Sequence, residues 1–117
     1  MRVKASLRFT YSWEETALVG EGPAASYFEL FRTIDLSAGG ALVARHVVNS
    51  AFPRVGVTGE CAFTIDSVEV RVAARVVAHR NGCYAVRFVA LPEALEDKLV
   101  AWVFRQETLL LRKRRAG

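Results

Sequence analysis

Apolar and polar residues alternate over most of the first ninety positions of the chain. Over residues 2–10, Val3, Leu7 and Phe9 share one side, while basic and hydroxyl-bearing residues occupy the other. A period of two with one apolar side is typical of a half-buried β-strand. The same pattern, or a strand-like composition, predicts strands over residues 2–10, 26–34, 41–48, 55–65, 68–79 and 83–89.

Residues that favour turns separate these predicted strands. Residues 11–25 lack a clear period and contain two glycines and a proline, so we expect a long loop there. Asn81-Gly82 is the strongest hairpin signal, because a type I′ turn needs a positive φ at both central residues. In the strand before that turn, the apolar positions up to Ala78 should face one way, and Val77 and His79 the other.

The pattern changes to helical spacing after Leu91. Pro92 fits the first position of a helix, acidic residues follow it, and a basic run closes the chain. We therefore expect a barrel of about residues 2–90 and a helix of about 92–113. By this reasoning the fold is mostly β: six short antiparallel strands in a small barrel or sandwich, with the helix over one face or end.

Composition places the chain among single-domain globular proteins. It has 117 residues, of which 52% are hydrophobic and 24% charged, enough for one buried core. No apolar run approaches the ~20 residues of a membrane span, and no signal peptide is evident, so we expect a cytoplasmic protein. Cys61 and Cys83 lack metal-type spacing and are interpreted as free thiols.

Neither an enzyme nor a metal site is indicated by these residues. His46 and His79 belong to no catalytic or metal-binding motif and are interpreted as surface strand residues. No glycine-rich phosphate loop is present, so we expect no catalytic residues, no metal and no cofactor. The net charge of +4 permits an anionic ligand, but the strands carry no aromatic and basic stripe of the kind that binds RNA, so we do not expect nucleic acid as a partner.

The segment from Asp35 to Gly40 is the most informative for function. A carboxylate, a hydroxyl and two glycines within one turn can simply cap that turn through local hydrogen bonds. Alternatively, the Asp35 carboxylate can accept from the two donors on the Watson–Crick edge of guanine. Ser37 could then add a hydroxyl contact, and Gly40 would let a ligand approach the backbone.

Residues 33–43 resemble the DxSxxG turn of PilZ domains, and residues 70–89 are similar to the last hairpin of that family. The resemblance extends from Arg2 to about Gln106. It implies a single PilZ-like domain: a six-stranded antiparallel β-barrel with a C-terminal helix that binds cyclic di-GMP, a bacterial second messenger. In the family, the Asp and Ser of this turn contact guanine, and Asp35, Ser37 and Gly40 match the turn position by position.

Family members also carry an RxxxR segment before the first strand, whose arginines stack on guanine and pair with phosphates. Arg2 resembles the second of these arginines, and the position of the first falls before Met1. The resemblance therefore implies a ligand site formed by Arg2, Asp35, Ser37 and Gly40. Lys4, Arg8 and Arg87 are further candidates for the missing cation, although each can equally be a solvated strand residue.

Two functions remain open at this point. The chain can be a cyclic di-GMP receptor module that relays the second messenger to a protein partner. Alternatively, it can be a divergent adaptor of motility or surface-attachment machinery that acts through protein contacts without nucleotide. Leu109, Leu110 and Leu111 lie beyond the family-like portion and predict a surface for such a partner or for a homodimer, unless they pack on their own barrel.

Overall fold

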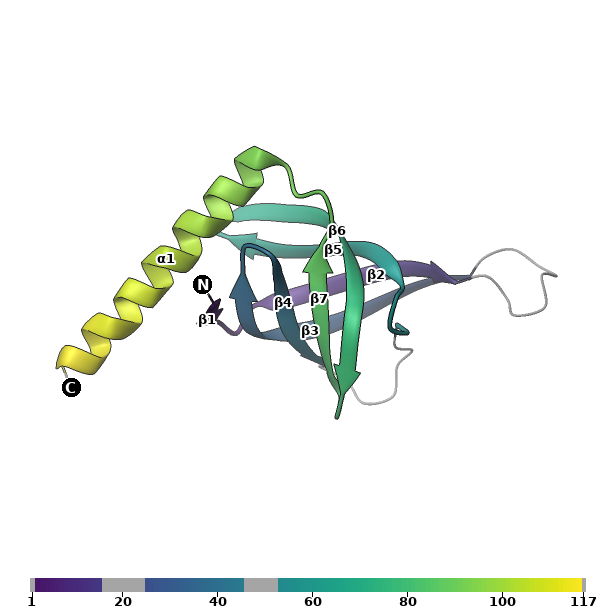
Figure 1. Cartoon of the computed structure of the whole chain (residues 1–117), viewed down its shortest axis with the longest axis horizontal. Helices are drawn as coiled ribbons and strands as arrows, with labels where there is room; N and C mark the ends of the chain where they lie inside the picture. The colour runs from purple at the N-terminus through teal and green to yellow at the C-terminus, as the bar shows by residue number, and fades with distance from the viewer. Residues whose placement is uncertain (1, 16–24, 46–52, 117) are drawn as a thin grey trace.

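The fold is taken from a computed structural model that describes residues 2–15, 25–45 and 53–116. Figure 1 shows the strands curled into a barrel, with the helix crossing one end and its C-terminal part projecting away from the strands. The strands of the described part are β1 (Arg2–Lys4), β2 (Arg8–Glu15), β3 (Ala25–Ser37), β4 (Gly40–Arg45), β5 (Thr58–Ile65), β6 (Val68–Arg80) and β7 (Cys83–Phe88). The helix is α1 (Glu93–Ala116).

Six strands close into an antiparallel barrel because β3 pairs along both of its edges. One edge pairs with β2 and, farther along, with the short β1. The other edge pairs with β4. From β2 the sheet continues through β5, β6 and β7 back to β4. The predicted fold class, a six-stranded antiparallel barrel followed by a C-terminal helix, is confirmed, with β1 as one additional strand.

The inward-facing side chains of the barrel strands form a core rich in aromatic rings. Phe63 stacks between Phe9 and Phe88, with ring centroids 5.8 Å apart on each side. Each fully buried apolar side chain of this size contributes about 1.5–3 kcal/mol to folding. The buried helix residues extend the same core to α1; they are Leu99, Trp102 and Val103.

The first predicted strand is split in two by a break after Lys4. The alternation of faces survives the break, since Val3 and Phe9 are buried and Lys4 and Arg8 exposed. Thr33 of β3 spans the gap, because its hydroxyl donates to the Ala5 carbonyl and accepts from the Leu7 amide at 2.7 Å. The Thr33 amide also donates to the Leu7 carbonyl at 2.9 Å.

Several predicted boundaries were wrong. β2 continues to Glu15, so residues 11–15 are strand and not loop; Tyr11 and Trp13 extend the buried side that Phe9 begins. The predicted turn over 35–40 is shorter, because β3 runs to Ser37 and β4 begins at Gly40. The strand predicted over 55–65 begins only at Thr58. Residues 46–48 of the predicted third strand lie outside the described residues.

The hairpin between β6 and β7 confirms the Asn81-Gly82 turn, whose φ angles are 53° and 78°. The predicted faces of β6 hold as far as Val77, which is exposed, and fail from Ala78 onward. A bulge between Val76 and Ala78 shifts the register, so that residues after it change sides. His79 therefore stacks on the buried Tyr84 ring at 4.2 Å, whereas Ala78 pairs with Ala85.

The predicted helix is present as α1, which begins at Glu93, one residue after the predicted start at Pro92, and continues beyond the predicted end at 113. Its first turn carries Glu93 and Glu96, which complement the positive end of the helix dipole. Arg105 pairs with Asp66 in the β5–β6 turn and so ties the helix to the barrel. Leu109, Leu110 and Leu111 are exposed rather than packed on the barrel. No helix in the described residues is both long and apolar enough to cross a membrane.

Both cysteines are free thiols, as predicted. Cys61 is fully buried next to Tyr11, and burial raises the pKa of its thiol to about 12. The Tyr11 hydroxyl lies 3.0 Å from the carbonyl oxygens of Val57 and Ala74 and donates its single proton between them. Burial likewise raises the pKa of Tyr11 from 10.0 to about 12.

These raised pKa values predict a loss of stability in alkaline solution. Below pH 9 both groups are protonated in the folded and the unfolded chain, so their contribution is fully present. Above their ordinary pKa values the unfolded chain ionises first, and the free energy of unfolding should fall as the pH rises toward 12. Urea denaturation at a series of pH values measures this fall.

Tyr11→Phe isolates the tyrosine part of that effect. The substitution should lower the free energy of unfolding by about 1–2 kcal/mol at pH 8, because a buried carbonyl loses its donor. Above pH 10 the free energy of unfolding of this variant should fall less steeply with pH than that of the wild type. Tyr27→Phe is the matched control, since Tyr27 is only half-buried. An alkaline fall that is equally steep in Tyr11→Phe would contradict the assignment.

Candidate functional site

A one-residue bulge in β3 turns Asp35 and Ser37 toward the outside of the barrel. The register between β3 and β4 shifts between Thr33 and Asp35, so Ile34 is an extra residue in β3. With strict alternation, Asp35 would share the inward side with the buried Thr33. The bulge instead places Leu36 in the core, fully buried, and leaves Asp35 and Ser37 half-buried on the outer face.

The strand β1 lies against this same end of β3. Lys4 is directly opposite Asp35, and Arg2 is directly opposite Ser37. Lys4 is exposed, and cross-strand partners share one face of the sheet. Within the described residues, the Asp35 carboxylate makes neither a hydrogen bond nor an ion pair. It is therefore available to accept from a ligand, with basic residues one strand away.

The Ser37 hydroxyl is used within the turn. It accepts from the Gly39 amide at 3.3 Å and donates to the Gly40 carbonyl at 3.2 Å. Ser37 therefore caps the turn through local hydrogen bonds, the first of the two roles considered for it from the sequence. A hydroxyl oxygen has a second lone pair, so Ser37 keeps one acceptor site for a ligand donor.

A groove of about 350 Å³ opens beside these residues on the outer face of the barrel. It brings together three of the four predicted site residues, Asp35, Ser37 and Gly40, and adds the candidate Arg87. The other lining residues are mostly small or aliphatic: Gly39, Ala41, Leu42, Val77, Ala85 and Val86. A groove with an apolar floor and a few polar groups at its rim is typical of a ligand site.

Gly40 has a structural reason to be glycine. It pairs with Arg87 of β7, and a Cβ at this position would overlap the Val86 carbonyl oxygen and lie 3.1 Å from the Arg87 Cα. The two strands approach closely only because Gly40 has no side chain.

The remaining candidates fall elsewhere. Arg8 pairs with Arg32 and lines a different groove on the barrel wall, with Phe28 and Arg71, so it does not join Asp35. His79 lies near the β6–β7 turn, stacked on Tyr84. His46 lies outside the described residues. Within the described part of the chain, no group of three or more His, Cys, Asp or Glu side chains could hold a metal ion.

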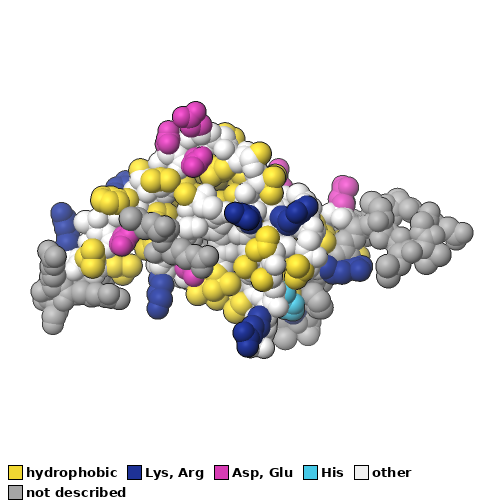
Figure 2. Space-filling view, viewed as in Figure 1, with side chains coloured by type: hydrophobic (Ala, Val, Ile, Leu, Met, Phe, Trp, Pro, Cys, Tyr) yellow, Lys and Arg dark blue, Asp and Glu magenta, His cyan; other side chains and the backbone are white. Residues whose placement is uncertain are grey.

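Sequence reasoning missed the contribution of β6. The bulged residue Val77 is exposed and lines the groove, and Arg75 stands directly opposite Arg87. If β6 and β7 paired without interruption from the Asn81-Gly82 turn, Arg87 would stand opposite Val76. The bulge shifts the register by one residue and places Arg87 opposite Arg75 instead. Figure 2 shows two basic side chains close together over this part of the barrel, with apolar side chains beside them.

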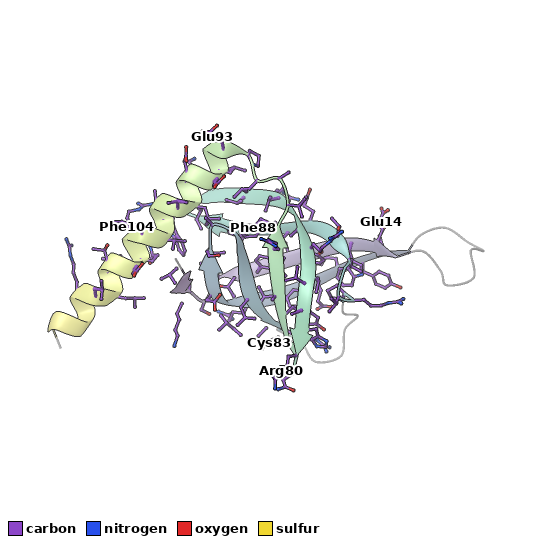
Figure 3. The ribbon with its side chains drawn as sticks, viewed as in Figure 1. Glu14, Arg80, Cys83, Phe88, Glu93 and Phe104 are labelled. Carbon is purple, nitrogen blue, oxygen red and sulfur yellow. The ribbon has the colours of Figure 1, made fainter. Side chains whose placement is uncertain are left out.

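A second hollow of about 290 Å³ lies on the other side of the Ser37 turn, against α1. It is lined by Ser37, Ala38 and Gly39 from the turn and by Val100, Val103 and Phe104 from the helix. Val100 and Phe104 are largely exposed. Figure 3 places Phe104 midway along α1, well beyond the start of the helix at Glu93. The turn that borders the groove therefore also faces an apolar part of the helix.

Comparisons with known proteins agree with the fold. The sequence matches the family model of the PilZ domain over residues 2–105. The structure is similar to the PilZ domain with c-di-GMP of YcgR from Escherichia coli, at a TM-score of 0.69 and 15% identity, covering 100% of this chain and 96% of that one.

Two further structures are similar over nearly their whole length. The PilZ domain of CeSA from a cellulose-synthesizing bacterium gives a TM-score of 0.62 and 20% identity, covering 92% of this chain and 98% of that one. The Legionella protein Lpg0364 gives a TM-score of 0.56 and 16% identity, covering 100% and 99%. A comparison with curated protein sequences gave no match.

Proposed function

The chain belongs to the PilZ family, and from this membership we propose that it is a receptor module that binds cyclic di-GMP in the groove beside Asp35 and relays its presence to a protein partner. The observation that carries the proposal is the bulge at Ile34, which displays Asp35 and Ser37 on the outer face of β3. The similarity to a PilZ domain with c-di-GMP bound supports it further. We take the barrel and helix as one such domain, acting in the cytoplasm where the messenger is made.

In this proposal each site residue has a chemical role. Asp35 accepts hydrogen bonds from N1–H and the exocyclic amino group of a guanine, and Ser37 accepts a further donor. Arg2, opposite Ser37 on β1, supplies positive charge toward the phosphates. The apolar floor formed by Leu42, Val77 and Ala85 gives the base a surface to pack on. No covalent step is involved, so the module acts by binding alone.

Isothermal titration calorimetry of the wild-type protein with cyclic di-GMP tests this proposal. Saturable heat in the micromolar range is expected, with none for GMP at the same concentration, because GMP lacks the second guanine and the ring. Absence of heat at high micromolar cyclic di-GMP would remove the receptor proposal and leave the adaptor. The adaptor has its own support in the exposed apolar residues of α1, which offer a partner surface without any ligand.

The hollow between the Ser37 turn and α1 suggests how binding is relayed. A ligand that orders the turn should alter the protection of the helix segment that faces it, around Val100 and Phe104. Hydrogen–deuterium exchange with and without cyclic di-GMP should show slower exchange in the turn and a change in that helix segment. The strand β2, which lines neither the groove nor the hollow against α1, is the internal control and should not change. Slower exchange in the turn with an unaltered helix would contradict the relay.

A further inference from the structure

Arg75 and Arg87 stand directly opposite each other on the neighbouring antiparallel strands β6 and β7. Both side chains are exposed on the outer face of the barrel. Opposite residues have Cβ atoms about 4.5–5.5 Å apart, and like charges at that separation destabilise a sheet. The protein therefore holds an arrangement that is unfavourable unless an anion neutralises it.

Another arginine of the same strand is neutralised by carboxylates. Arg71 lies four residues before Arg75 on the same outer face of β6, and it forms ion pairs with Glu69 and with Glu60. No carboxylate plays this part for Arg75 or Arg87, because neither guanidinium makes an ion pair within the described residues. Arg80 at the turn end of β6, and Arg8 opposite Arg32 on β2 and β3, also make no ion pair within the described residues. Arg75 and Arg87 differ from them in their place, because Arg87 lines the groove that contains Asp35.

The neighbours of the pair leave it accessible. On the β4 side Arg87 is opposite Gly40, which has no side chain, and on the β5 side Arg75 is opposite the small Thr58. Arg87 lines the groove that also contains Asp35. Two strand spacings, together about 10 Å, separate β3 from β7. A ligand whose base reaches Asp35 can therefore present a phosphate to β7.

We propose that Arg75 and Arg87 form a clamp for a phosphodiester group of the ligand whose base is held by Asp35. This clamp rests on the proposed function and adds a cationic edge to the groove, on the side opposite Arg2. Guanidinium groups suit the task because each offers a planar fork of donors to two phosphate oxygens and keeps its charge at any physiological pH. The ligand class is a guanine-bearing phosphodiester.

Calorimetry on charge-removing variants tests the clamp. Arg87→Gln should weaken cyclic di-GMP binding about tenfold, and the double variant Arg75→Gln/Arg87→Gln should weaken it further and reduce the dependence of affinity on salt. Arg71→Gln is the matched control: it removes the same charge from the same face of β6 and should change the affinity less than threefold. Without ligand, Arg75→Gln should leave the melting temperature unchanged or raise it, because a like-charge contact is relieved.

The outcomes separate the clamp from the proposed function. Wild-type binding that Arg75→Gln/Arg87→Gln leaves unchanged would overturn the clamp and keep the receptor. Wild-type protein that gives no heat with cyclic di-GMP would overturn the receptor, and inorganic pyrophosphate then serves as the probe. Millimolar binding of pyrophosphate that is lost in the double variant would support an anion clamp alone. Binding of neither probe would overturn both.

Discussion

Asp35→Ala is expected to lower the affinity for cyclic di-GMP at least about 100-fold while leaving the fold intact. Two hydrogen bonds from guanine to a carboxylate are each worth roughly 1.5–3 kcal/mol, and every 1.4 kcal/mol changes a dissociation constant about tenfold. The loss should appear as the disappearance of calorimetric heat. Because Asp35 is half-buried and has no hydrogen-bond or ion-pair partner among the residues that the structure describes, the free energy of unfolding should change by less than about 1 kcal/mol.

The matched control for this substitution is Asp97→Ala on α1. Asp97 is exposed on the helix and does not line the groove. Its substitution removes the same charge outside the site, so Asp97→Ala should bind cyclic di-GMP like the wild type. Binding in Asp35→Ala that is within threefold of wild type would show that the carboxylate does not hold the ligand. A strongly lowered melting temperature in Asp35→Ala would instead show that Asp35 supports the fold.

The fold could be predicted largely from alternation and turn chemistry. The alternation of residues 2–10 identified buried Val3 and Phe9, and the Asn-Gly pair located the last hairpin. The ends of the strands were harder to predict from the sequence. Tyr11 and Trp13 continue the period of two, but because glycines and a proline follow them, the predicted loop began too early, at residue 11 instead of after Glu15.

The site depended on features that a period of two does not encode. The bulge at Ile34 decides that Asp35 and Ser37 face outward beside the groove, and the bulge at Val77 decides that Arg75 stands opposite Arg87. Neither residue is a glycine or proline, so no local signal marks the extra position. The resemblance to a family motif pointed to Asp35 and Ser37, whereas Arg75 belonged to no motif and became visible only through its register with Arg87.

The two bulges have a common consequence for function. The bulge in β3 flips the side-chain alternation and brings out a carboxylate, and the bulge in β6 shifts the register so that Arg75 stands opposite Arg87. The barrel thus keeps a continuous core while its outer wall acquires acceptors, an apolar floor and cations in one place. The closeness of β4 and β7 at Gly40 holds these parts in register.

Gly40→Ala is accordingly expected to destabilise the protein more than any other single methyl addition in this region. The new Cβ would overlap the Val86 carbonyl oxygen, and a backbone atom of a closed barrel cannot move aside without separating β4 from β7. Overpacking of this kind costs about 1–3 kcal/mol or more. For a domain of about 100 residues this corresponds to a fall in melting temperature of roughly 4–24 °C.

Gly39→Ala supplies the neighbouring control for that experiment. A Cβ on Gly39 would meet only the Ser37 hydroxyl oxygen, at 3.9 Å, which is an ordinary contact. Its melting temperature should therefore stay within about 3 °C of wild type, measured by circular dichroism under the same conditions. Because the separation of β4 from β7 displaces Arg87 from the groove, Gly40→Ala should also weaken cyclic di-GMP binding at temperatures where it is still folded. Equal melting temperatures for the two alanine variants would show that the barrel absorbs the overlap and that the close approach at Gly40 is not what holds the site together.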